Sequence, residues 1–161
     1  MRSQTSSFKA FWSRGLAVVN NEHILISLES RHAENIFAGH KRVELRRRTM
    51  NVSPGATLWI YVKLPVGSIV GHARIDKVHS SSPSALWRHY GSVSGLSKHE
   101  FFKYFDGLEQ GVALVLEKST RLQSSLSLKA LRQFSEGFQP PQFFARLTSE
   151  HPLHEVVTSS N

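Results

Sequence analysis

The sequence predicts an α+β fold in which a small mixed β-barrel is flanked by short helices. Strand-like segments dominate the chain, and the helical patterns between them are short and irregularly spaced. The regular strand–helix alternation of a doubly wound sheet is missing, which favours a barrel. With 161 residues, of which 40% are hydrophobic, the chain is long enough for one domain with a real core.

Several segments have the alternation or the β-branched and aromatic composition of strands. They are Ile24–Glu29, the basic stretch within Gly39–Arg48, Thr57–Leu64, Ile69–Val78 and Gly111–Leu122. Pro54 and Gly55 mark a turn before the third of these segments, and a kink or bulge is expected at Gly71.

Short helices are predicted from start and stop signals. They are expected from Ser30 to Gly39, from Ser82 to Gly91, from Ser97 to Gly107, around Leu128–Phe134, and over one or two turns at Gln142–Leu147. Ser30 is the expected N-cap of the first helix, Ser82 precedes a proline, and Ser97 and Glu100 form a capping-box pattern. The domain is expected to span residues 23–148, with a partly disordered extension at 1–22 and a flexible tail at 149–161.

The composition limits the classes of function. Because there is no cysteine, disulfides and thiolate zinc sites are excluded. No apolar run approaches the roughly 18 residues of a membrane span, and no signal-peptide pattern opens the chain. We therefore expect a cytoplasmic protein that does not bind membranes. The 20 Lys and Arg residues against 12 Asp and Glu give a net charge of +8, which favours polyanionic partners.

The stretch Gly39–Arg48, GHKRVELRRR, carries the densest charge. On a strand, Val43, Leu45 and Arg47 share one face, expected to be the barrel interior, while Arg42, Glu44, Arg46 and Arg48 share the other. Two interpretations remain open. One is a solvated basic strand with a local ion pair, and the other is a site where Lys41 and Arg46 hold an anion while Glu44 orients them or takes a proton.

A second basic and aromatic pattern lies on the strand at Thr57–Leu64. Trp59, Tyr61 and Lys63 share one face of this strand. They are either a stacking platform for single-stranded nucleic acid or, for the two aromatic residues, barrel core.

The spacing Gly39-x-Lys41-x-x-Glu44-x-Arg46 reproduces the GxKxxExR motif, and the chain resembles the ASCH domain family of the PUA-like superfamily. The resemblance covers about Ile24–Leu147 and is strongest to small stand-alone prokaryotic members. It implies a β-barrel with a basic cleft that binds RNA or a nucleotide, with DNA also possible. The cleft residues it implies are Gly39, Lys41, Glu44 and Arg46, to which we add Tyr61 and Lys63 as expected lining residues.

Three functions stay open at this point. The first is nucleic-acid or nucleotide binding, which can be regulatory. The second is a ribonuclease or nucleoside-processing hydrolase with Lys41, Glu44 and His40 as candidate catalytic residues. The third is a regulatory protein-interaction module.

Three further expectations concern the chemistry of the site. Some relatives of the family are amidohydrolases with a Thr nucleophile beside the Lys; here the position three after Lys41 is Glu44, and the nearest Thr is Thr49. The nine His residues are scattered, so neither a metal site nor a cofactor is expected, and His40 is the one worth attention. The oligomeric state does not follow from the sequence.

Overall fold

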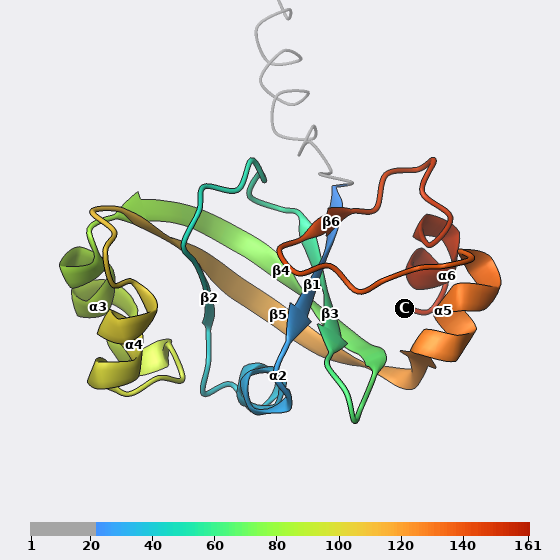
Figure 1. The fold of residues 1–161 in the computed structure, drawn as a ribbon, viewed down its shortest axis with the longest axis horizontal. Coiled ribbons are helices and arrows are strands. Elements are labelled where there is room, and N and C mark those ends of the chain that lie inside the picture. The colour runs from blue at the N-terminus through green and yellow to red at the C-terminus, as the bar shows by residue number, and fades with distance from the viewer. Residues whose placement is uncertain (1–21) are drawn as a thin grey trace, which may run out of the picture.

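A computed structural model describes residues 22–161. Its elements (Figure 1) are β1 (His23–Leu28), α2 (Ser30–Phe37), β2 (Val43–Arg46), β3 (Thr57–Val62), β4 (Ser68–Ser81), α3 (Pro83–Tyr90), a 3-10 turn η1 (Gly91–Val93), α4 (Lys98–Tyr104), β5 (Gly111–Ser127), α5 (Leu128–Phe134), β6 (Ala145–Arg146) and α6 (His154–Thr158).

The strands form one curled six-stranded sheet in the order β2-β5-β4-β3-β1-β6. The pair β1–β3 is parallel, and the other neighbours are antiparallel. The long strands β4 and β5 cross the whole molecule, with α3 and α4 near one end and α5 and α6 near the other (Figure 1). The predicted α+β fold with a small mixed barrel is confirmed, in the form of a half-barrel.

The sheet curls around Gly71, where the expected irregularity is present. The register of β4 shifts between Ile69 and Gly71 against β5. A Cβ atom at Gly71 would lie 2.4 Å from the Thr120 carbonyl oxygen and 2.6 Å from the Phe37 ring. Glycine is therefore required here, because α2 and β5 both approach the backbone closely.

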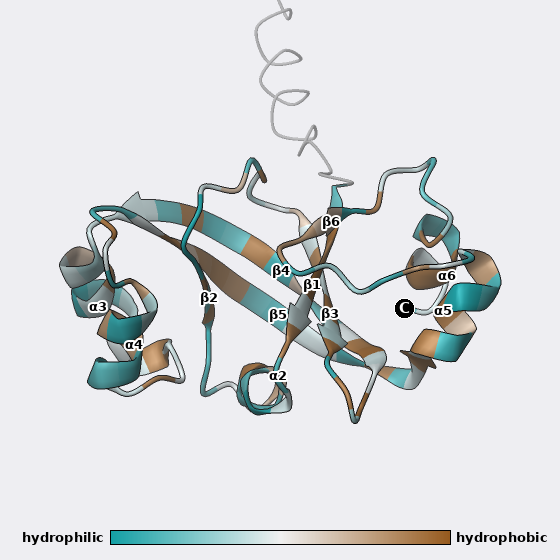
Figure 2. Cartoon of the chain, in the orientation of Figure 1, coloured by the Kyte–Doolittle hydropathy of each residue, from teal (hydrophilic) through white to brown (hydrophobic). Residues whose placement is uncertain are grey.

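Three apolar clusters hold the sheet and the helices together. The inner cluster fills the concave side of the sheet and includes Ile24, Ile60 and Leu114. Two outer clusters pack the opposite side, one under α5 and α6 and the other under α3 and α4. Figure 2 shows the resulting alternation of hydrophobic and hydrophilic bands along β4 and β5. The strands are buried on both faces, on the concave side by the inner cluster and on the opposite side by the helices. This explains the apolar character of the sheet.

Most predicted helix signals act as expected. Ser82 accepts a hydrogen bond from the Ala85 amide at 3.2 Å, and Ser97 and Glu100 form the complete capping box. Ser30 differs, because it is the first helical residue of α2 and Glu29 holds the N-cap position without a side-chain hydrogen bond.

The C-terminal third differs more from the predictions. Gln142–Leu147 forms no helical turn; Ala145 and Arg146 instead make β6 and pair with Leu25 and Ile24 on the open edge of β1. The segment after Ser149 was expected to be a flexible tail, but it contains α6, which packs onto the outer cluster. Leu153 and Val157, four residues apart, are both buried and make the apolar contact of α6 with this cluster. The other residues of this segment are mostly polar, so the sequence gives little sign of the contact.

Other expectations lie at the edges of the described chain. The extension predicted for residues 1–22 falls almost wholly outside the described residues. Within residues 22–161, no helix is long and apolar enough to cross a membrane.

The docking of α6 can be tested through its buried leucine. Leu153 is 0% exposed, whereas Leu64 is 75% exposed. Leu153→Ala should lower the free energy of unfolding by about 2–5 kcal/mol, because it leaves a cavity in the outer cluster. Leu64→Ala is the matched control and should change it by less than about 0.5 kcal/mol. Urea denaturation followed by circular dichroism measures both, and equal stabilities would show that α6 is not docked.

Candidate functional site

The chain turns sharply between α2 and β2, and this turn positions Lys41. Gly39 has φ +80°, a conformation that favours glycine. The amides of His40 and Lys41 both donate to the Asn35 carbonyl at 2.9 Å. Lys41 therefore leaves the turn in a fixed direction.

Strand β2 has the predicted alternation, but its two faces are exchanged relative to the prediction. Val43 and Leu45 pack outward against the cluster under α3 and α4. Glu44 and Arg46 face the concave side, because their partners across the ladder are Leu114, an inner-cluster residue, and Val112. The physical reason is that α3 and α4 offer a large apolar surface outside the sheet, which satisfies Val43 and Leu45 there.

Three charged motif residues are consequently buried. Lys41, Glu44 and Arg46 are only 3%, 7% and 8% exposed. Lys41 Nζ lies 3.6 Å from Glu44 Oε2, and Arg46 Nη2 lies 3.4 Å from Glu44 Oε1. The interpretation as a solvated basic strand is wrong for these three residues, although Arg42, Arg47 and Arg48 are exposed.

Burial determines the electrostatics of this trio. Removal of Lys41 from water lowers its pKa, and the neighbouring Glu44 carboxylate opposes that shift. Arg46 Nε and Nη2 make no hydrogen bond within the described residues, so the contact of Arg46 with Glu44 is an ion pair without directed geometry. One carboxylate is thus shared by two cations, which leaves the trio with a net positive charge.

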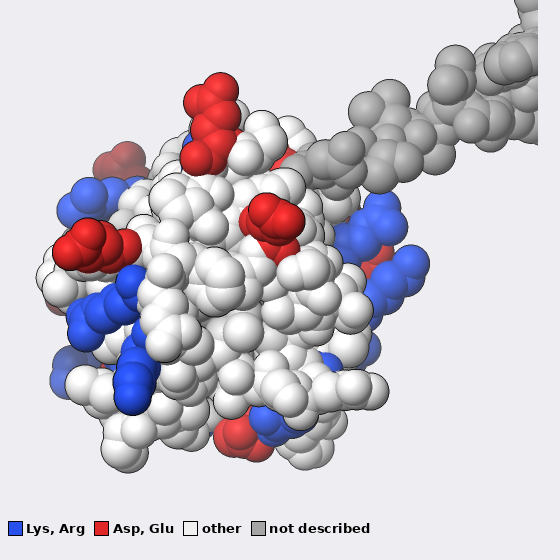
Figure 3. Space-filling view, turned by 90° about the vertical axis from the view of Figure 1, so that its right-hand side faces the viewer, with Lys and Arg blue, Asp and Glu red and all other residues white. Residues whose placement is uncertain are grey.

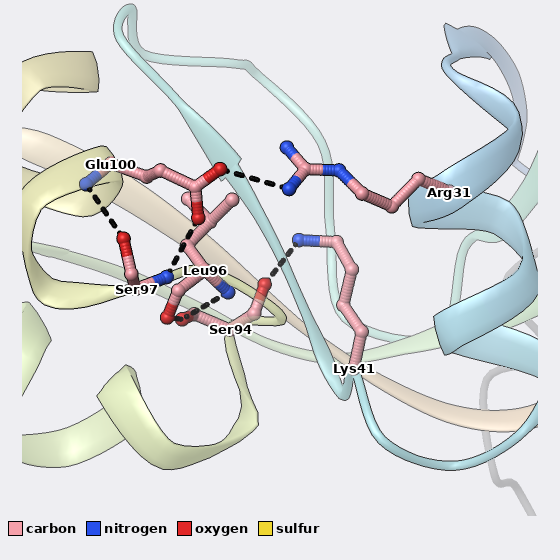
Figure 4. Close-up of polar contacts among 6 residues, drawn as sticks. All are labelled: Arg31, Lys41, Ser94, Leu96, Ser97 and Glu100. Atoms are coloured by element: carbon pink, nitrogen blue, oxygen red, sulfur yellow. Dashed lines mark hydrogen bonds and ion pairs between the residues drawn. The ribbon is translucent and has the colours of Figure 1, made fainter.

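Backbone carbonyls from distant segments complete the coordination of the two cations. Lys41 Nζ donates to the Ser94 carbonyl at 2.9 Å (Figure 4). Ser94 itself is held by its hydroxyl, which donates to the Gly91 carbonyl at 2.8 Å. Arg46 Nη1 donates to the Phe143 carbonyl at 3.0 Å. No sequence pattern around the motif pointed to Ser94 or Phe143.

A cavity of about 370 Å³ opens over Lys41 and Glu44. Its lining residues are Arg31, His32, Lys41, Glu44, Leu45, Leu96, Glu100, Lys103 and Tyr104. Arg31 and Glu100 form an ion pair of 2.8 Å between α2 and α4 at this cavity (Figure 4). The Ser97 amide, followed by Arg31, lowers the pKa of Glu100 to about 2. The site therefore combines a buried lysine–carboxylate pair with a charged wall.

His32 is a cavity residue that the sequence analysis did not single out. Its Nδ1 is buried and has no hydrogen-bond partner within residues 22–161. Burial, followed by the positive charge of Lys41, lowers the pKa of His32, so its imidazole is neutral near pH 7. One sequence signal was available, since His32 precedes the buried Ile36 by four residues and shares its helix face.

A second cavity, of about 350 Å³, adjoins the first at Tyr104. It is lined by Arg46, Arg47, Arg48, Tyr104, Gln142 and Phe143. The guanidinium carbons of Arg46 and Arg48 each lie 5.9 Å from the centre of the Phe143 ring. The exposed Arg47 and Arg48 and the half-buried Phe143 ring here provide a cationic surface next to the buried trio.

The remaining predicted lining residues lie elsewhere. Trp59 and Tyr61 are buried in the outer cluster under α5 and α6, so the stacking-platform interpretation is wrong for them. Tyr61 and Lys63 line a third cavity, without Lys41, because Tyr61 faces the outer side of the sheet. Gly39 lies beside Lys41 at a small fourth cavity of about 120 Å³. His40 is exposed and lines none of these four cavities.

Within residues 22–161, no three His, Asp or Glu side chains gather in a way that would hold a metal ion.

The charge balance of the trio can be tested with one isosteric change. Glu44→Gln leaves Lys41 and Arg46 buried without a counter-charge and should cost about 3–5 kcal/mol of unfolding free energy. The control is Glu34→Gln, since Glu34 pairs with Arg121 at 2.6 Å on the surface, and such a loss costs about 1 kcal/mol or less. Guanidinium denaturation compares the two variants. A cost for Glu44→Gln no larger than that of the control would mean that the trio is solvated.

The chain matches one family model and several known proteins in sequence. Residues 23–147 match the family model described as a domain of unknown function, DUF365. The chain is 32% identical to an ASCH domain-containing ribonuclease of Zymomonas mobilis over 143 residues, which cover 89% of this chain and 96% of that protein. It is 27% identical over 120 residues to a protein of Ureaplasma parvum named large ribosomal subunit protein uL22, of which it spans 39%.

The fold gives the same assignment. The crystal structure of ASCH from Zymomonas mobilis superposes with a TM-score of 0.79 at 31% identity, covering 86% of this chain and 96% of that chain. The 32% identical relative and the matching fold show that the chain belongs to the ASCH domain family, and its residues 23–147 also belong to the DUF365 family.

Proposed function

We propose that this protein is a ribonuclease, which binds RNA in the cavity over Lys41 and Glu44 and cleaves it there. The observation that carries the proposal is the buried Lys41–Glu44 pair, which faces an open cavity and is flanked by cations. A relative of nearly the same length, 32% identical, is named a ribonuclease, which supports an RNA-directed activity.

The two adjoining cavities suit a polyanionic chain. Lys103 and Arg31 line the first, and the three consecutive arginines Arg46–Arg48 line the second. Phosphates of a bound strand would be neutralised along this path, in keeping with the net charge of +8. Tyr104 lines both cavities, so they lie next to each other, and the proposal has one strand contact both.

The residues of the first cavity have the chemistry for cleavage through the ribose 2′-hydroxyl. Neutral His32 accepts the proton of the 2′-hydroxyl, whose oxygen attacks the adjacent phosphorus and displaces the 5′-oxygen of the next nucleotide. The products are a 2′,3′-cyclic phosphate and a 5′-hydroxyl once that oxygen takes up a proton. Lys41, held by Glu44 and the Ser94 carbonyl, stabilises the charge that develops on the phosphate oxygens.

The other candidate activities have less support from the geometry. A hydrolase with a Thr nucleophile beside Lys41 is disfavoured, since Thr49 is exposed beyond β2 and lines none of the four cavities. Binding of RNA without cleavage, binding of DNA, and a protein-interaction role remain as outcomes that the experiments below distinguish.

Removal of the Lys41 ammonium tests the proposal directly. Lys41→Met keeps the length of the side chain and should lower kcat/KM for a single-stranded RNA oligonucleotide by about 100-fold or more. Lys98→Met is the control, because Lys98 is exposed at the start of α4 and outside the cavity. Cleavage of a 5′-labelled oligonucleotide and of its all-deoxy analogue is followed on gels. Undiminished cleavage by Lys41→Met refutes the site, and a wild-type protein that binds RNA without cleaving it refutes the ribonuclease.

The pH dependence tests the role of His32. Because a general base acts unprotonated, cleavage should fall as the pH drops through the pKa of His32, which lies below its ordinary value of 6.5. His32→Asn should lower the rate and remove this acidic limb. Rate profiles between pH 4.5 and about 8 for both proteins provide the measurement. A limb that persists unchanged in His32→Asn would assign the base to another residue.

A further inference from the structure

The largest of the four cavities lies away from the motif. It has a volume of about 730 Å³, against about 370 Å³ for the cavity over Lys41. It opens where β3 ends, between α5 and the chain segment at Gln139–Gln142. Its volume is within the range of small-molecule sites in proteins, roughly 300–1,000 Å³.

A buried tyrosine points an unused hydroxyl toward this cavity. Tyr61 is 2% exposed, and its Oη makes no hydrogen bond within residues 22–161. Burial raises the pKa of Tyr61, so the phenol keeps its proton and is a hydrogen-bond donor at neutral pH. Because this hydroxyl has no protein partner among these residues and Tyr61 lines the cavity, it is available to donate to a ligand or to solvent there.

Two cations with remaining donors line the same cavity. Lys63 pairs with Glu29 at 3.1 Å, which occupies one of its three N–H groups. Arg132 donates through Nε to the Phe138 carbonyl at 3.0 Å and through Nη2 to Gln139, which leaves Nη1 available. No Asp or Glu lines the cavity, so its lining carries two positive charges and no negative charge.

Apolar side chains form much of the remaining wall, which also includes Ser27, Gln139 and Gln142. Leu64, Leu128, Pro140 and Pro141 line it. The two prolines have restricted backbones, and the Ser27 hydroxyl donates to the Pro141 carbonyl at 2.8 Å, which ties this segment to β1. The face over α5 and α6 carries few charged side chains at its centre, and both Lys and Arg and Asp and Glu lie around it (Figure 3).

We propose that this cavity is a second binding site, distinct from the RNA site, for a small organic anion. A phosphate or carboxylate group is held by Tyr61 Oη, Lys63 Nζ and the Arg132 guanidinium, and a flat or apolar body lies against Leu128 and the two prolines. Any such ligand has one anionic group and a larger organic body. Inorganic phosphate alone would supply the charge but would not fill the cavity.

The site is also connected to the motif through one short segment. Gln142 lines both this cavity and the one formed by Arg46, Arg47 and Arg48. The carbonyl of Pro141 accepts from Ser27, and that of Phe143 accepts from Arg46. A ligand in the second site therefore contacts the segment that supplies the hydrogen-bond acceptor of Arg46.

Calorimetric titration of the full chain with three probes tests the proposal. The probes are adenosine monophosphate for a phosphate ester, benzoate for an aryl carboxylate, and inorganic phosphate as the anion without a body. At least one of the first two should bind at millimolar or lower concentration and more tightly than inorganic phosphate. Lys63→Ala and Arg132→Ala should each weaken that binding by about tenfold, as expected for loss of a charge-assisted hydrogen bond.

Two further variants keep this test specific. Tyr61→Phe preserves the packing of the outer cluster and should weaken binding several-fold without loss of thermal stability. Arg88→Ala removes an exposed arginine on α3 and should leave binding unchanged. No binding of any probe at about 10 mM, a limit far weaker than specific ligands reach, overturns the proposal. The proposal is also overturned if Lys63→Ala and Arg132→Ala bind the probe as tightly as the wild type does. The same holds if Arg88→Ala weakens binding as much as those two variants do.

A competition experiment separates this site from the proposed RNA site. A single-stranded RNA oligonucleotide should not displace the bound probe, and Lys63→Ala should cleave RNA like the wild type. Displacement by RNA together with weaker RNA binding in Lys63→Ala would make the cavity part of the RNA path and refute a separate site. Loss of RNA cleavage in Lys41→Met with normal probe binding leaves the second site intact, so the two proposals fail independently.

Discussion

The burial of three charges, on β2 and in the turn before it, is the constraint on which this structure depends. Charged groups removed from water require partners, because an unpaired buried ion costs several kcal/mol, on the order of 3–5 in proteins. Glu44 serves Lys41 and Arg46 together, and carbonyls of Ser94 and Phe143 supply the remaining contacts. These contacts link β2 to the loop before α4 and to the segment before β6, so the same interactions hold the site and two distant parts of the chain.

Local signals in the sequence were enough for the elements whose causes are local. The caps at Ser82 and Ser97, the turn at Pro54–Gly55 and the irregularity at Gly71 each follow from a few neighbouring residues. β6 was missed because it exists only where the edge of β1 offers free hydrogen-bonding groups. α6 was missed because two apolar residues in a polar tail reveal a helix only once the outer cluster is known.

For the site, too, the sequence predicted what local spacing determines and missed what depends on tertiary packing. The motif spacing located Lys41, Glu44 and Arg46, and the structure brings these three together. Alternation along a strand separates two faces, but it does not say which of them is inside, since that depends on what packs against each. The faces of β2 were therefore exchanged, and Tyr61 and Lys63 were assigned to the cavity of Lys41 although the sheet places them at another. Ser94 and Phe143 lie 53 and 97 residues from the side chains that they accept from, so only tertiary contacts bring them to the site.

Stability does not account for a buried trio of this kind. A packed apolar replacement of a buried ion pair is often neutral or stabilising by about 1–4 kcal/mol. The inner cluster beside Glu44 is apolar, with Leu114 as its partner across the ladder, so apolar side chains would suit the concave face. The trio instead places a desolvated lysine and its carboxylate at the floor of an open cavity, where low dielectric strengthens their effect on a bound anion. Because Val43 and Leu45 pack outward against the cluster under α3 and α4, they anchor β2 and direct Glu44 toward the cavity that we propose as the RNA site.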